Sequence, residues 1–128
     1  MIIDVHIHCA LSGVGRLKKN LMQSDTPERR NWFNSLLARY KKANVFALRD
    51  GGDAYSAGIY FKPIVQDQGI IYKTPIRALY KKGQYGDFLG VGLTGIDSCR
   101  AEMNQLLKEK PDFIKIVQSG IMSFEDFG

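Results

Sequence analysis

The chain has 128 residues, of which 45% are hydrophobic and 24% charged, a composition typical of a folded globular protein and not of a disordered one. Its formal net charge of +5 comes from short basic clusters within helix-like sequence, which favours solvated helix faces over a nucleic-acid surface. No apolar run reaches the roughly 18 to 20 residues of a membrane helix, and no secretory signal is recognisable, so we expect a cytoplasmic protein.

The two cysteines lie far apart, at Cys9 and Cys99, without the paired spacing of a disulfide framework or a cysteine zinc site. We therefore expect reduced thiols. Strand alternation turns Cys9 to the face opposite its neighbour His8, which predicts a buried structural thiol and not a ligand or nucleophile.

The predicted elements alternate between strands and helices. A β-branched run over 2–7 predicts a buried strand, and Asp25-Thr26-Pro27-Glu28 has a capping residue, a proline and a first-turn acid, as at a helix start. That helix should run to about residue 42. We expect further strands at 45–48, 70–72 and 113–117, helices at 53–66 and 96–110, a long glycine-rich loop over 80–95, and a possible helix start near residue 123.

This alternation predicts an α/β fold with right-handed parallel crossovers. Because the strands are almost continuously apolar, they require cover on both faces. We expect residues 1–128 to form about the first four βα units of a TIM-like (β/α)8 barrel, with no separate second domain. A complete barrel takes ~250 residues, so the chain should be a fragment that pairs with a missing half-barrel or with itself.

The first predicted strand carries the clearest chemistry. Asp4, His6 and His8 project from one face of it, and the carboxyl end of a parallel strand is where barrel enzymes place catalytic groups. The two imidazoles are the only ones in the chain and predict a metal site, with zinc before iron or nickel. The alternative is that each histidine only bonds a backbone carbonyl. Asp4 either orients an imidazole from behind or merely begins the strand.

Lys115 lies between apolar neighbours on the last predicted strand. Because burying an ammonium group is costly, this lysine must meet a carboxylate, lose its proton or be modified, unless it extends to solvent. Arg77 and Tyr80 are candidates for a substrate mouth, with a solvated loop as the alternative.

The segment Ile3-Asp4-Val5-His6-Ile7-His8 resembles the D-x-H-x-H signature of the amidohydrolase superfamily. Phe113-Ile114-Lys115-Ile116 is similar to its fourth-strand segment, and Leu48-Arg49-Asp50-Gly51-Gly52 to the end of its second strand. The resemblance implies that His6, His8 and Lys115 bind one or two divalent metals, with Lys115 carboxylated by carbon dioxide to a bridging carbamate.

The implied activity is hydrolysis of an amide, cyclic amide or related bond in a small molecule by metal-activated water. The family's remaining histidines and its catalytic aspartate would lie beyond Gly128, so we expect the 128-residue chain alone to be inactive. Two alternatives stay open: a TatD-like phosphodiesterase or nuclease that needs no modified lysine, and a noncatalytic half-barrel assembly module.

Overall fold

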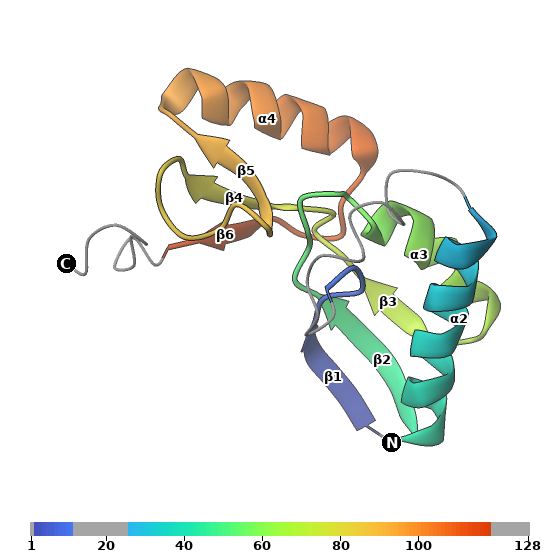
Figure 1. The fold of residues 1–128 in the computed structure, drawn as a ribbon. Helices are drawn as coiled ribbons and strands as arrows, with labels where there is room; N and C mark the ends of the chain where they lie inside the picture. The colour runs from blue at the N-terminus through green and yellow to red at the C-terminus, as the bar shows by residue number, and fades with distance from the viewer. Residues whose placement is uncertain (1, 12–25, 119–128) are drawn as a thin grey trace.

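The computed structural model describes residues 2–11 and 26–118 (Figure 1). None of the helices in these two ranges is long and apolar enough to cross a membrane. The strands are β1 (Ile2–Ile7), β2 (Val45–Asp50), β3 (Ile71–Lys73), β4 (Ala78–Lys81), β5 (Gly90–Leu93) and β6 (Lys115–Val117), and the helices are α2 (Pro27–Lys42), α3 (Gly58–Asp67) and α4 (Ile96–Glu109).

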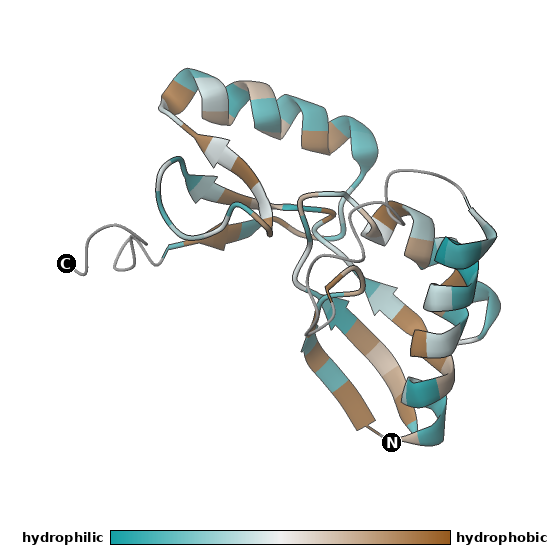
Figure 2. Cartoon of the chain, in the orientation of Figure 1, coloured by the Kyte–Doolittle hydropathy of each residue, from teal (hydrophilic) through white to brown (hydrophobic). Residues whose placement is uncertain are grey.

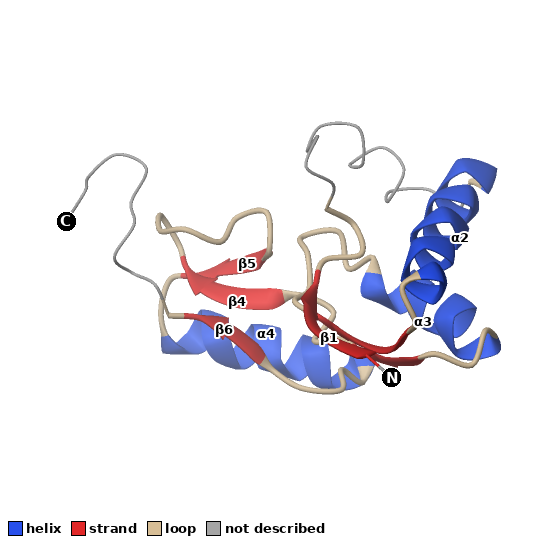
Figure 3. Cartoon of the chain, turned by 90° about the horizontal axis from the view of Figure 1, so that it is seen from below, coloured by secondary structure: helices blue, strands red, loops and turns tan. Residues whose placement is uncertain are grey.

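The first sheet is parallel throughout, in the order β1-β2-β3. Helices α2 and α3 cover one of its faces (Figures 1 and 3). The rings of Phe33, Phe61 and Tyr72 pack in series between these helices and the sheet. On the other face Ile3, Val5 and Ile71 are more than half exposed, so the prediction of strands covered on both faces is wrong for this sheet. In Figure 2 β1 and β2 carry brown segments interrupted by teal ones, whereas α2 and α4 carry much teal, as expected of helices with one face in water.

The predicted start of α2 is confirmed. The Thr26 side chain accepts a hydrogen bond from the Arg29 backbone N–H at 3.3 Å, and Pro27 occupies the first turn, where its missing N–H costs nothing. Helix α3 begins later than predicted. The Asp53 carboxylate instead accepts the backbone N–H groups of Tyr55 and Ala57, which holds the preceding residues in a turn.

The second sheet is also parallel, in the order β5-β4-β6, and α4 packs against it. Its buried cluster is small and consists of Ile76, Leu79 and Leu106. Beside this cluster the Arg77 guanidinium, 9% exposed, forms ion pairs with Glu102 at 2.6 Å and with Glu109, both on α4. A buried arginine thus connects β4 to the helix.

The prediction of a partial TIM-like (β/α)8 barrel is wrong, because over 2–11 and 26–118 the strands form two separate three-stranded sheets with three helices. The hydrogen-bond pairing of the first sheet ends between β3 and β4. Pro75 has no N–H, Ile76 adopts φ 70°, and the Arg77 N–H bonds the Pro75 carbonyl at 2.8 Å. This kink stops pairing with β2 and starts the new sheet.

The segment expected to be one long loop over 80–95 contains the end of β4 and all of β5. Strand β5 pairs directly with β4 without an intervening helix, so the predicted strict alternation fails there too. Gly90 permits the close approach, since a Cβ at this position would lie 1.7 Å from the Ala78 carbonyl oxygen. The helix start expected near residue 123 lies outside the described residues.

Candidate metal centre

His6 and His8 meet at the carboxyl end of β1. His6 belongs to the strand and His8 follows its last residue, yet their Nε2 atoms lie 3.1 Å apart and their ring centroids 5.1 Å apart. The rings are tilted by 57°, so they converge at their Nε2 edges instead of stacking. The structure therefore brings together the two imidazoles singled out from the sequence.

The turn after β2 holds the His8 ring. His8 Nδ1 lies 2.7 Å from the Gly52 carbonyl oxygen, which can only accept, so Nδ1 is the donor. In the neutral ring the lone pair of Nε2 then faces His6 Nε2, and it can accept a hydrogen bond from that atom or bind a metal. The ring also lies against Gly51, where a Cβ would come 2.4 Å from His8 Cε1. The Gly51 N–H donates to the Ile7 carbonyl at 2.7 Å, fixing the turn against β1.

Lys115 reaches the same place from the second sheet. It lines a cavity of about 440 Å³ with both histidines, and the remaining walls come from Tyr85, Phe88, Leu89, Ile116, Val117 and Gln118. Lys115 is half-buried at the start of β6, and within ranges 2–11 and 26–118 it forms no ion pair with a carboxylate. Among the described residues, Lys115 therefore does not pair with a carboxylate, which was one of the alternatives predicted for a buried lysine.

The charges around the cavity act on His6. Partial burial, followed by the positive charge of Lys115, lowers the pKa of His6, and Asp4 opposes this shift. A lowered pKa keeps the imidazole neutral, which is the form that binds metals. The Asp4 carboxylate accepts the backbone N–H of His6 at 3.1 Å, so its observed hydrogen bond stabilises the strand and does not orient a ring.

The two proposed substrate residues lie elsewhere. Arg77 forms ion pairs with Glu102 and Glu109 on α4 and does not line the histidine cavity. Tyr80 lines a separate apolar cavity of about 480 Å³ between the ends of β4, β5 and β6 and the start of α4. The structure thus groups His6, His8 and Lys115 and leaves Arg77 and Tyr80 apart from them.

Sequence reasoning missed the aromatic wall of the cavity. Tyr85 and Phe88 come from the segment treated as a glycine-rich loop, and their rings pack edge to face with centroids 5.2 Å apart. The signal in the sequence was the presence of two aromatic residues in that loop, because large aromatic side chains are usually at least partly buried.

A buried cluster lies directly behind the histidines. Cys9, Asp50 and Asp53 have 0% exposure, and one potential ligand atom of each lies within 4.8 Å of the others. Burial raises the pKa of Asp53 to about 7, with the Ala57 N–H opposing the shift, and burial raises the pKa of the Cys9 thiol well above its ordinary value. The prediction that Cys9 is buried is confirmed.

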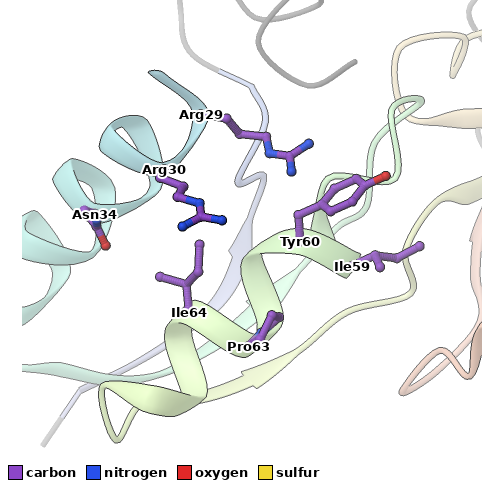
Figure 4. Close-up of a pocket in the computed structure, with 7 residues that line it drawn as sticks. All are labelled: Arg29, Arg30, Asn34, Ile59, Tyr60, Pro63 and Ile64. Atoms are coloured by element: carbon purple, nitrogen blue, oxygen red, sulfur yellow. The ribbon is translucent and has the colours of Figure 1, made fainter. Parts of the chain in front are cut away.

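A third surface feature separates α2 from α3 (Figure 4). This groove of about 330 Å³ is lined by Arg29, Arg30, Asn34, Ile59, Tyr60, Pro63 and Ile64, and the Arg29 guanidinium lies 4.0 Å from the Tyr60 ring centroid. None of these lining residues is a histidine, cysteine or carboxylate. The groove therefore differs in chemistry from the histidine cavity.

Comparisons of the chain with protein-family models, with curated proteins and with solved structures found no match, so function is inferred from the site itself.

Proposed function

We propose that the protein is a metal-dependent hydrolase of the amidohydrolase type, cleaving an amide, cyclic amide or related bond of a small molecule. One observation carries the proposal: two imidazole nitrogens lie 3.1 Å apart and share a cavity with Lys115. A cavity of about 440 Å³ falls within the range of small-molecule sites.

The donor atoms fit a zinc ion. Two imidazoles on one tetrahedral zinc, with bonds of ~2.0–2.1 Å, have nitrogens roughly 3.3 Å apart, close to the separation in this structure. The Gly52 carbonyl fixes the His8 tautomer in the way that metal-binding histidines are commonly oriented. When bound, such an ion supplies Lewis-acid chemistry, polarising a substrate oxygen and making water more acidic.

Lys115 must change its charge to take part. An ammonium group repels a divalent cation, so an unmodified lysine would oppose binding in this cavity. The neutral Nζ amine can instead attack carbon dioxide: a C–N bond forms, one C=O π bond becomes a C–O⁻, and a nitrogen proton leaves to solvent. The product is an anionic carbamate with two oxygen ligands, which converts the repulsion into attraction.

The remaining walls suit a small organic substrate. Tyr85 and Phe88 present aromatic surface, and Leu89 is buried beside them. Apolar walls with a few convergent polar groups can orient a compact molecule. In this proposal His6, His8 and Lys115 bind the metal, and the aromatic side chains of the cavity wall contact the substrate.

Metal content tests the histidine assignment. Zinc should be retained after dialysis by the wild type and should fall by one ion per chain in His6→Ala and in His8→Ala. Gly51→Ala should produce the same loss because the new Cβ would meet the His8 ring. Gly95→Ala is the matched control, since nothing lies within 4 Å of a Cβ there. Unchanged zinc content in both histidine variants would refute the proposal.

Intact-mass measurement at native pH with added bicarbonate tests the lysine assignment. We expect a mass increase of one carbon dioxide in the wild type, absent in Lys115→Ala and retained in Lys81→Ala, whose side chain is exposed. Metal binding without this increase would instead favour the phosphodiesterase alternative, in which Lys115 needs no modification.

A further inference from the structure

We propose that Cys9, Asp50 and Asp53 form a second, structural metal site that binds a thiophilic divalent cation such as zinc. The three residues lie behind the histidine cavity, on the chain next to His8, at the end of β2 and in the turn before α3. This site shares no proposed ligand with the histidine centre, and its inference does not depend on the proposed hydrolase function.

Asp53 supplies the observation that points to a ligand. Its Oδ1 accepts the backbone N–H of Tyr55 at 2.8 Å and of Ala57 at 3.2 Å, whereas its Oδ2 is buried with no hydrogen-bond partner. Leaving a buried carboxylate oxygen without a partner is costly. A cation between Asp53 and its neighbours would satisfy this oxygen.

The Asp50 carboxylate is fixed by hydrogen bonds to one oxygen, and its other oxygen is available to bind a metal. Its Oδ2 accepts the hydroxyl groups of Tyr72 at 2.7 Å and Thr74 at 3.1 Å. Its Oδ1 has only the Cys9 backbone N–H, at the long distance of 3.4 Å. Two strong donors on one oxygen therefore orient the carboxylate and leave lone pairs of the other available, as for a metal ligand supported from behind.

Cys9 determines which ion fits, and assigning it as a ligand departs from the prediction made from the sequence. Its Sγ lies 3.8 Å from Asp50 Oδ2 and 3.5 Å from the Tyr72 hydroxyl. A sulfur ligand favours zinc over magnesium or calcium, which prefer oxygen only. The ligand atoms, now within 4.8 Å of one another, would close to about 3.5 Å around a tetrahedral zinc.

A divalent ion would offset most of the ligand charge. On binding, the Cys9 thiol and any protonated carboxyl release their protons to solvent, and the ion compensates two of the three negative ligands and leaves one negative charge in the site. Because all three ligands have 0% exposure, no substrate can reach the ion, which makes its role structural. The bound ion would connect the residue after β1 to the end of β2 and to the turn before α3, close to the Gly51-Gly52 turn that holds the His8 ring.

Cobalt titration of the full chain tests the site, because only this centre contains sulfur. The protein is unfolded, freed of metal and refolded with Co²⁺. We expect a near-ultraviolet thiolate-to-cobalt absorption band that is lost in Cys9→Ser and kept in Cys99→Ser. The band should also persist in His6→Ala and His8→Ala, which separates this site from the histidine centre.

Asp53→Asn provides a second, nearly isosteric measurement should Cys9→Ser fail to fold. We expect the cobalt affinity of the sulfur site to fall at least tenfold in this variant. The proposal is overturned if the refolded wild type shows no sulfur band, or if the band survives Cys9→Ser. It is equally overturned if Asp53→Asn leaves cobalt affinity unchanged, since the unpartnered oxygen is then simply that of a protonated acid.

Discussion

The two parallel sheets have the same number of strands but are held together by different forces. Behind the first sheet, α2 and α3 bury a core that includes Phe33, Phe61 and Tyr72. Behind the second, the buried cluster consists of Ile76 and Leu79 packed with Leu106 of α4, and α4 is tied to β4 by the ion pairs of Arg77. Apolar burial therefore dominates the first sheet, and charge contributes a larger share to the second.

The histidine cavity depends on both sheets. His6 and His8 come from the end of β1, and Lys115 comes from the start of β6 in the other sheet. Loosening either sheet therefore separates the proposed ligands, even where no ligand is changed. The comparison predicts that substitutions in the first sheet act on global stability, whereas substitutions in the second act on α4 and on the placement of Lys115.

The largest expected effect belongs to the aromatic core. Phe61→Ala removes a ring that contacts Phe33 at 4.8 Å and Tyr72 at 5.1 Å between centroids. We expect the free energy of unfolding to fall by about 3–5 kcal/mol, measured by urea denaturation. Ile59→Ala on the same helix is the control, because its side chain is 40% exposed and should change stability little. Equal losses in the two variants would show that α3 does not anchor the core.

A smaller effect is expected at the buried arginine. Arg77→Ala leaves Glu102 and Glu109 without their partner and should cost about 2–4 kcal/mol, less than a fully buried pair because both glutamates keep some contact with water. Hydrogen exchange should accelerate in α4 more than in α2. Arg100→Ala is the matched control on α4, since its pair with Asp97 is exposed and such pairs contribute about 0–1 kcal/mol. Uniform acceleration across both helices would contradict the division between the sheets.

Much of the secondary structure could be predicted from local pattern. The β-branched run of β1 and the proline-containing cap of α2 are signals carried by a few adjacent residues, and both elements lie where expected. His6 and His8 meet as predicted, although His8 lies just past the last residue of β1, so strand alternation alone does not explain their contact. Cys9 is buried as predicted, but it lies in the turn after β1 and not on the strand.

The arrangement of the strands could not be predicted in the same way. Whether β3 continues into β4 depends on the conformation of Ile76, a φ of 70° that nothing in its own residue type favours. The role of Arg77 depends on two glutamates 25 and 32 residues away. Placing Lys115 beside His6 likewise required contacts between sheets, which no spacing along the chain encodes.

The smallest effect concerns one of the residues that connect the two sheets. Asp112, just before β6, accepts hydrogen bonds from Lys62 at 2.7 Å, from the Thr74 backbone N–H at 3.0 Å and from Lys73 at 3.2 Å. Burial alone would raise the pKa of Asp112, but these donors outweigh it and hold the pKa below the ordinary value of 3.8. Because the folded-state pKa is lowered, the stabilisation is complete above the unfolded-state pKa and is lost as pH falls through the folded-state value.

Asp112→Asn should therefore lower the free energy of unfolding by about 1 kcal/mol at neutral pH, and the difference from wild type should shrink towards zero below about pH 4. Urea denaturation at a series of pH values measures this, with Asp67→Asn on the exposed end of α3 as the control. A difference that persists undiminished in acid would mean that the carboxylate charge is not what joins the sheets. Separate unfolding transitions for the two sheets in Asp112→Asn, but not in the control, would show that this one side chain makes them fold as a unit.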